Sequence, residues 1–306
     1  MTRRAIFIFV LLAVAVSWAM QFAAIGVFGL GTPGASLVFL LIMWSPTLLA
    51  AGFLILHRPS REGVLWRLGR LRYLPIGIAV ETALGFAVVG LLVAAGLAVS
   101  GWFVFGAEGV AVSGGPWLLG RGEQAWPLFL LNIVLTAVAF SVMNLVAATG
   151  EEFAWRGFLQ GHLTRQFGVR PGILVLAAIW TVWHFPALLA GYNFPEHPYL
   201  GAFVLFPLQM IGASLFFGWL TIRSGSFWPA ALAHGAVNSI QQGVVGNLGP
   251  EGSALHADVL LTALMALVGL FCWFALGDER RTGRPDQRKG RPREAKPPRN
   301  ATRPLR

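Results

Sequence analysis

Long apolar stretches separated by short polar ones make up most of the chain. A helix needs about 20 mainly apolar residues to cross about 30 Å of hydrocarbon, and eight stretches meet or approach this length. They are residues 5–30, 36–56, 73–99, 127–150, 171–190, 199–223, 226–247 and 256–276. The pattern predicts an all-α membrane protein, a polytopic bundle of about eight transmembrane helices.

The bounds of the first and fourth stretches depend on their flanking residues. The first follows Arg3 and Arg4 and is longer than the apolar core of a secretory signal, roughly 7 to 15 residues, so it predicts an uncleaved span. The fourth can continue past Glu151 and Glu152, because apolar side chains recur from Phe153 to Leu159.

Composition supports the membrane assignment. Hydrophobic residues make up 56% of the 306 residues and charged residues only 12%, and the mean hydropathy is +0.67. A soluble domain carries about 25% charged residues, so a water-soluble globular enzyme is excluded. The lone Cys272 excludes an internal disulfide framework and a multi-thiolate metal site.

The net charge of +10 is unevenly distributed. Eleven of the 23 Lys and Arg residues and four of the 13 acidic ones lie in residues 277–306, so this tail alone carries +7. The other basic residues flank apolar segments, where the positive-inside rule accounts for them, and nucleic acid is not needed as a partner. The eight-span arrangement places both termini on the cytoplasmic side and only Arg121 outside. The other arginines of the loops are then cytoplasmic: Arg58, Arg61, Arg67, Arg70, Arg72, Arg156, Arg165, Arg170 and Arg223. We expect an integral protein of a bacterial plasma membrane, since Arg greatly outnumbers Lys.

Four regions follow from this reading. Residues 1–126 hold about three N-terminal transmembrane helices and an outer loop, and residues 127–247 form a core. Residues 248–276 contain the last transmembrane helix. Residues 277–306 form a basic cytoplasmic tail that has too few apolar residues to fold.

Polar residues inside the apolar stretches are the candidates for function, because an ionisable group there costs about 2.5–3.5 kcal/mol on insertion scales. The ionisable ones are Glu81, Glu151, Glu152, Arg156, His184 and His234, and the amides are Asn132, Asn144, Gln209 and Asn238.

Glu152 and Arg156 are four residues apart, so they share a helix face and can form an ion pair. Glu151 points about 100° away and is free to face another group. Glu152 would then be held ionised by Arg156 in a structural role, while Glu151 would be available for chemistry. The alternative is that these charges mark only the cytoplasmic end of the fourth helix.

Two further motifs lie in later stretches. Trp180 is four residues before His184 and shares its helix face, and Pro186 frees a backbone carbonyl nearby. His234 and Asn238 are one turn apart among small residues, which leave room for a substrate backbone; the alternative is a polar pair that only bridges helices.

Taken together, the three motifs resemble a known family. Glu151 to Arg156 is similar to the EExxxR motif, Trp180 to His184 to FxxxH, and His234 to Asn238 to HxxxN, in the order found in the CPBP family. This family, also called ABI, comprises intramembrane CAAX proteases of the Rce1 type and bacteriocin-processing or immunity proteins. The resemblance covers roughly residues 127–247. It departs at Trp180, where Phe is usual. We expect this change to affect packing beside His184 more than chemistry.

The resemblance implies peptide-bond hydrolysis at a site inside the bundle. Glu151 would activate a water molecule, and His184 would share that water or relay its proton. His234 and Asn238 would donate hydrogen bonds to the oxyanion, while Glu152 and Arg156 would orient Glu151. Partners would be the lipid bilayer and a peptide or lipidated-protein substrate.

Three alternatives remain at this stage. No cofactor is required by the glutamate chemistry, but Glu151, His184 and His234 could instead ligate a catalytic zinc. Intramembrane Glu and His residues also occur in proton-coupled transporters, although no inverted repeat is evident here. A non-catalytic scaffold, for instance in peptide immunity, is the third possibility. Glu81 receives no catalytic role.

Overall fold

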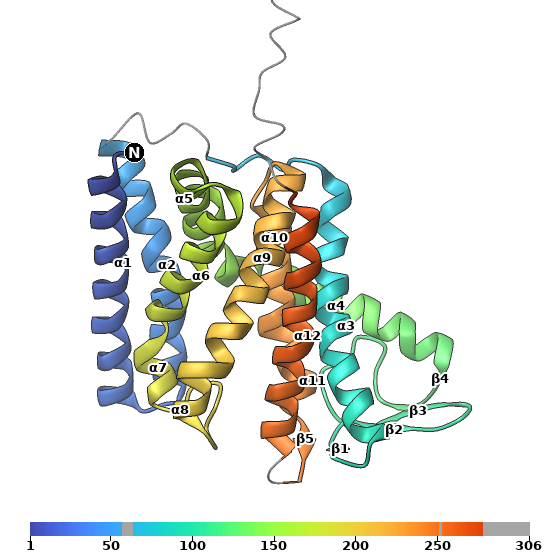
Figure 1. The fold of residues 1–306 in the computed structure, drawn as a ribbon. Helices are drawn as coiled ribbons and strands as arrows, with labels where there is room; N and C mark the ends of the chain where they lie inside the picture. The colour runs from blue at the N-terminus through green and yellow to red at the C-terminus, as the bar shows by residue number, and fades with distance from the viewer. Residues whose placement is uncertain (57–63, 251–252, 278–306) are drawn as a thin grey trace, which may run out of the picture. The chain divides into compact units, whose positions relative to one another are not determined.

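The computed structural model describes residues 1–56, 64–250 and 253–277, and residues 1–276 form one compact unit. Arg58 and Arg61 and nearly all of the basic tail, residues 278–306, lie outside the described residues. Within the unit, helices run up and down between two ends, and the N-terminus lies at the upper end in Figure 1.

Among the described residues, six helical segments are long and apolar enough to cross a membrane. They are Arg3–Phe28, Pro33–Leu56, Leu71–Ala94, Trp126–Phe167, Pro198–Ser224 and Ser253–Ala275. The first consists of α1 (Arg3–Ala23) and a π-helical end, η1 (Ala24–Phe28). α2 (Pro33–Leu56) is the second, η3 (Leu71–Tyr73) and α3 (Leu74–Ala94) form the third, and α12 (Ser253–Ala275) is the last. This confirms an all-α polytopic membrane protein.

The expected fifth and seventh spans are shorter or interrupted. α6 (Val169–Trp183) ends just before His184, and α7 (Phe185–Leu189) begins beside Pro186. The seventh stretch is divided into α10 (Trp228–Ala236), η6 (Val237–Gln241) and α11 (Gln242–Val245). The count of eight spans therefore stays a prediction.

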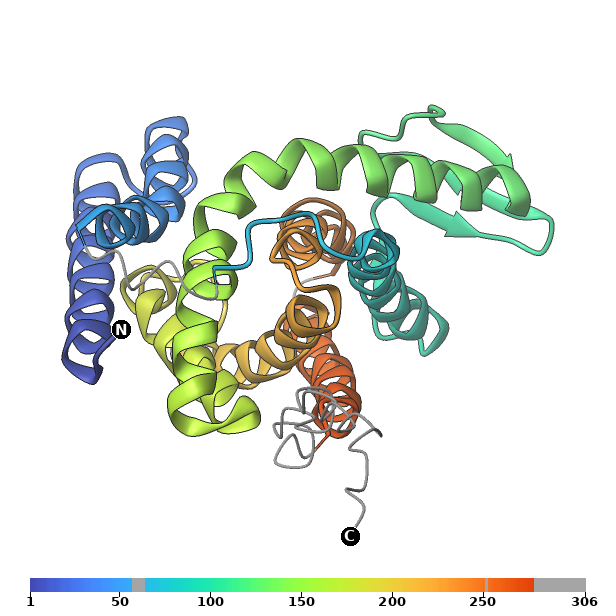
Figure 2. The same ribbon diagram turned by 90° about the horizontal axis from the view of Figure 1, so that it is seen from above.

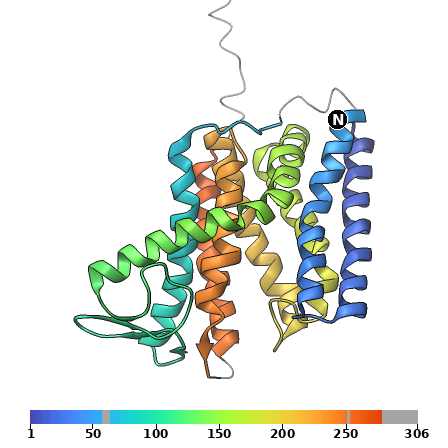
Figure 3. The same cartoon turned by 180° about the vertical axis from the view of Figure 1, so that it is seen from behind.

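The remaining helices connect these segments. α4 (Trp126–Glu152) continues through the π-helical η4 (Phe153–Leu159) into α5 (Gln160–Phe167). α8 (Pro198–Leu200) and the π-helical η5 (Gly201–Leu205) lead into α9 (Phe206–Ser224). Figure 2 shows α4 curving around α10, and Figure 3 shows it crossing the other helices obliquely.

The outer loop contains a small sheet that the apolar pattern does not predict. β2 (Phe103–Phe105), β3 (Gly109–Val112) and β4 (Gly122–Ala125) form an antiparallel sheet in that order, with Val104 opposite Ala111 and Val110 opposite Gln124. β1 (Val99–Ser100) pairs with β5 (Leu248–Gly249) and joins this region to the end of α11. Asn132 belongs here, since its side chain accepts a hydrogen bond from the backbone N–H of Leu119 at 2.9 Å.

Two glycines let helices approach closely beside the candidate residues. A Cβ on Gly235, next to His234, would lie 2.6 Å from the carbonyl oxygen of Ser141 on α4. A Cβ on Gly150, next to Glu151, would lie 2.8 Å from the carbonyl oxygen of Met43 on α2. Small residues permit such contacts between membrane helices, and here they bring α10 against the middle of α4 and α2 against its end.

Candidate active site

The three polar motifs converge although they lie on different helices. Glu151 and Glu152 end α4, His184 follows the last residue of α6, and His234 lies in α10. The acidic pair is followed by the π-helical η4, and Asn238 lies in the π-helical η6. Such turns often occur at functional sites, because they re-aim side chains without ending the helix.

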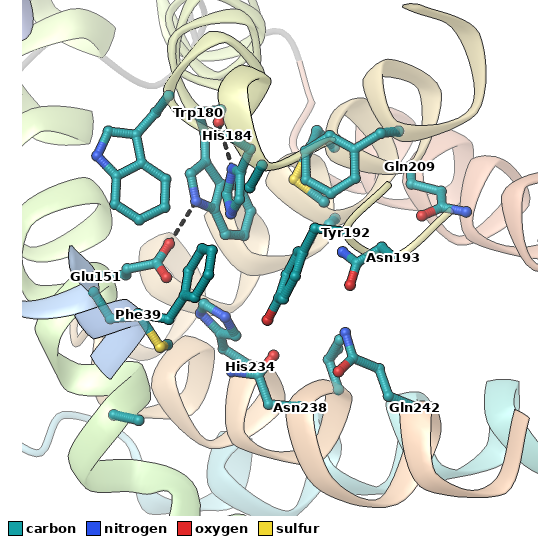
Figure 4. A pocket seen from close by; sticks show the side chains of 18 of the residues that line it. Phe39, Glu151, Trp180, His184, Tyr192, Asn193, Gln209, His234, Asn238 and Gln242 are labelled. Atoms are coloured by element: carbon teal, nitrogen blue, oxygen red, sulfur yellow. Dashed lines mark hydrogen bonds between the residues drawn. The ribbon is translucent and has the colours of Figure 1, made fainter. Parts of the chain in front are cut away.

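Glu151 is held by two indoles. Its Oε2 accepts a hydrogen bond from Trp180 Nε1 at 2.7 Å and a longer one from Trp155 Nε1 at 3.4 Å. The residue is only 2% exposed, and among the described residues its other oxygen, Oε1, has no hydrogen-bond partner. Figure 4 shows the carboxylate at the edge of a cavity, directed toward Trp180.

Glu152, unlike Glu151, takes part in an ionic network with Arg156 and His234. Its Oε1 lies 2.9 Å from Arg156 Nη1 and 2.9 Å from His234 Nδ1. Arg156 also donates to Ser214 Oγ at 3.3 Å, and its guanidinium lies 4.1 Å from the ring centre of Trp180. Neither Glu152 nor Arg156 is exposed.

The burial of Glu152 and Arg156 changes two expectations from the sequence. Arg156 is not a cytoplasmic surface charge, because it lies inside the bundle, paired with Glu152. The acidic pair does not simply mark a helix end, since the helical path continues through η4 and α5 to Phe167.

His184 has a defined orientation. Its Nδ1 lies 2.8 Å from the carbonyl oxygen of Trp180. A carbonyl can only accept, so Nδ1 carries the proton and the neutral ring keeps a lone pair on Nε2. The indole of Trp180 lies between the two imidazoles, with its ring centre 6.0 Å from that of His184 and 5.6 Å from that of His234.

A cavity of about 270 Å³ connects these groups. Glu151, His184, His234 and Asn238 all line it, together with Trp180, whereas Glu152 and Arg156 lie behind the wall. The structure therefore brings together every residue that the motifs single out, five at the cavity and two behind its wall.

Several residues of the site were not expected from the sequence. Trp180 packs beside His184, as expected, but its indole N–H also donates to the Glu151 carboxylate, a contact that the sequence does not predict. Tyr192, in the segment between α7 and α8, stacks on Phe39 of α2 with ring centres 4.9 Å apart. Its hydroxyl end points toward His234 and Asn238 in Figure 4.

Gln21 on α1 supports the break between α6 and α7. Its amide nitrogen donates to the carbonyl of Trp183 at 2.7 Å, and its amide oxygen accepts from the N–H of Ala187 at 2.9 Å. Backbone groups freed at a helix break need such partners. The signal in the sequence was a glutamine inside an apolar stretch.

Of the other polar residues, Asn144 and Gln209 line the cavity. Glu81 pairs with a core group, since its Oε2 accepts a hydrogen bond from Gln241 Nε2 at 2.7 Å.

The described residues do not bring together a zinc ligand set. In residues 1–56, 64–250 and 253–277, no three His, Cys, Asp or Glu side chains converge in an arrangement that could hold a metal ion. As placed, Glu151, His184 and His234 do not form the required ligand set.

The fold is thus that of a helical membrane protein, and a carboxylate and two histidines line its internal cavity. Residues 126–240 match the family described as type II CAAX prenyl endopeptidase Rce1-like. The match confirms the resemblance to the CPBP family of CAAX proteases over these residues and supports, in general terms, a CAAX-type intramembrane protease. No curated protein matches the chain.

Proposed function

We propose that the protein is an endopeptidase that cleaves a membrane-associated or apolar peptide with a water molecule activated by Glu151. The observation that carries this proposal is the environment of Glu151. Trp180 holds one carboxylate oxygen of Glu151, and the same cavity is lined by His184, whose Nδ1 is bound to the Trp180 carbonyl and whose Nε2 is left for other contacts. A general base must be within reach of the proton that it removes, and two bases here face one space.

In the proposed reaction, Glu151 takes a proton from water while the water oxygen attacks the peptide carbonyl carbon. His184 accepts a hydrogen bond from the same water through Nε2, or relays its proton. The carbon–nitrogen bond then breaks, and the proton is returned to the departing amine.

His234 and Asn238 are the proposed donors to the oxyanion. Because Glu152 binds His234 at Nδ1, the other ring nitrogen, Nε2, is left for the cavity. An imidazolium paired with Glu152 carries a proton on Nε2 and can donate it in a hydrogen bond to the developing negative charge. The Asn238 amide supplies a second donor from the next turn.

Glu152 and Arg156 are proposed as positioning residues. Their ion pair fixes His234 from behind, and Arg156 also packs over Trp180, the donor to Glu151. One buried pair thus orients both halves of the site.

The substrate is proposed as a CAAX-type or bacteriocin-type peptide, lipidated or apolar. A cavity of about 270 Å³ within the bundle holds only a short segment of chain.

The test is cleavage of an apolar and prenylated peptide library by purified protein and by Glu151→Gln. The substitution keeps the size and the hydrogen-bond acceptor for Trp180 but removes the base, so we expect a loss of about 10²–10⁴-fold in rate with an unchanged unfolding temperature. A Glu151→Gln protein of wild-type activity would contradict the proposal, and no cleavage by either protein would favour a non-catalytic scaffold.

A further inference from the structure

Glu81 is a buried acid that the proposed reaction does not use. It lies within α3 and is 0% exposed. Its Oε2 accepts a hydrogen bond from Gln241 Nε2 at 2.7 Å, whereas its Oε1 is covered and has no partner among the described residues. No Lys, Arg or His in the described part of the chain forms an ion pair with it. An ionisable side chain inside a membrane span is costly and by default indicates a functional site, so a role is expected at its single partner, Gln241.

The packing of α3 brings Glu81 against the segment that carries part of the site. A Cβ on Gly77 would lie 2.9 Å from the Cβ of Ala233 on α10, and a Cβ on Gly85 would lie 3.1 Å from the Cα of Gln241 in η6. Gly77, Glu81 and Gly85 follow one another at a spacing of four, so they share one face of α3. The two glycines let the backbones approach, and the carboxyl group of Glu81 between them reaches Gln241.

Gln241 connects this buried acid to the cavity. It lies in η6 with Asn238, three residues earlier, and both line the cavity. Its amide nitrogen is bound to Glu81, and its amide oxygen has no hydrogen-bond partner among the described residues. Unlike Glu81 Oε1, that oxygen is not completely covered. A carboxamide directs its nitrogen and its oxygen to different sides, so an amide held by its nitrogen offers an acceptor to the cavity.

We propose that Gln241 binds the backbone of the substrate by accepting a hydrogen bond from a peptide N–H, and that Glu81 is the positioning residue that orients its amide. The proposal rests on the proposed function and adds a binding subsite to it. Because Glu81 accepts from Nε2, it determines which end of the amide faces the cavity. Without this acceptor, the amide could turn and present its nitrogen instead.

The spacing of the proposed contacts agrees with an extended substrate. His234 and Asn238 are the proposed donors to the oxyanion, and side chains three residues apart on a helix are about 5–6 Å apart. An extended peptide advances about 3.3 Å per residue, so the N–H that meets Gln241 lies one or two residues from the scissile bond. A contact with the backbone does not depend on the substrate side chain, which suits a site for apolar and lipidated peptides alike.

The test uses a short farnesylated peptide with a fluorescent label, and versions of it that are N-methylated at one backbone nitrogen each. N-methylation removes one N–H and leaves the side chains unchanged. Dissociation constants are measured on purified Glu151→Gln protein, in which cleavage should be too slow to interfere. We expect methylation of one nitrogen, near the scissile bond, to weaken binding by about 2–12-fold, the range for a single hydrogen bond.

Removing the acceptor should abolish this preference. With Gln241→Met added to Glu151→Gln, the unmodified peptide should bind about 2–12-fold more weakly, and methylation of the same nitrogen should have no further effect. Glu81→Met should reduce the preference too, because the amide loses its orientation. The matched control is Gln160→Met, since Gln160 is buried on α5, donates to the carbonyl of Gly218 and does not line the cavity. In this control the preference should persist, although a buried hydrogen bond is lost.

The double variant Glu81→Met/Gln241→Met removes both partners of the buried bond, which is tolerated better than removing one, so it serves where a single variant does not fold. An unchanged preference in Gln241→Met or in the double variant would overturn the proposal. An unchanged preference in Glu81→Met, or equal binding of all the methylated peptides by the Glu151→Gln protein, would do so as well. Binding does not depend on catalysis, so the expected binding pattern without cleavage by the unmodified protein would count against the proposed function alone.

Discussion

Glu151 and Glu152 are neighbours in the chain, but they lie in two different regions of the site. Around Glu152, Arg156 and His234 form a buried polar network behind the cavity wall, in which one oxygen of Glu152 binds both partners. Around Glu151, the partners are the neutral N–H groups of two indoles, and a cavity begins at its free side. Adjacent residues on one helix can thus acquire separate roles, because the helix turns them toward different neighbours.

Removing the charge of Glu152 should break the ionic region and produce the largest loss of stability. Glu152→Gln leaves Arg156 buried without its anion, which typically costs about 3–5 kcal/mol. We expect a marked fall in the unfolding temperature in detergent, together with loss of cleavage. Glu151→Gln is the matched control, because it leaves the Arg156–Glu152 pair intact, and equal unfolding temperatures for the two variants would refute the division of roles.

Replacing Trp180 by Phe should affect the cavity region alone. The change removes a hydrogen bond to a charged group, worth about 1.5–3 kcal/mol, so we expect kcat to fall by about tenfold or more with KM little changed. Trp155→Phe removes the longer bond and should have a smaller effect. If kcat stayed constant in Trp180→Phe, this indole would not serve Glu151.

Tyr192 lines the cavity on the Glu151 side of this comparison and can be tested for contact with the substrate. Although Tyr192 as a whole is 40% exposed, its hydroxyl points into the site, where loss of hydration and then the charge of Glu151 raise its pKa, so the group keeps its proton and remains a donor. Tyr192→Phe should raise KM severalfold, in keeping with about 0.5–1.5 kcal/mol for one hydrogen bond, and leave kcat nearly unchanged. Tyr199→Phe, an exposed tyrosine on α8 outside the cavity lining, is the control, and equal KM values for both variants would exclude a contact between Tyr192 and substrate.

Part of this arrangement could be predicted from the sequence. Apolar stretches locate most of the long helices, and the spacing of four between Glu152 and Arg156 gives their ion pair. Helical spacing also places His184 beside Trp180, since the histidine caps the carbonyl four residues earlier. These features depend on neighbours along one helix.

The rest depends on contacts between distant segments, which periodicity does not encode. The π-helical turns at η4 and η6 shift side-chain directions that a regular helix would give. The bond from Trp180 to Glu151 joins α6 to α4, and the stacking of Tyr192 on Phe39 joins a loop to α2. The sheet of residues 103–125 was missed because its strands are only three or four residues long.

The most direct test of the central claim is one preparation of purified protein measured for both metal content and peptide cleavage, with and without a chelator. The account predicts cleavage that requires Glu151 and is unchanged by the chelator. Stoichiometric zinc that is lost in His184→Ala or His234→Ala, together with cleavage that the chelator abolishes, would contradict it and make those histidines metal ligands.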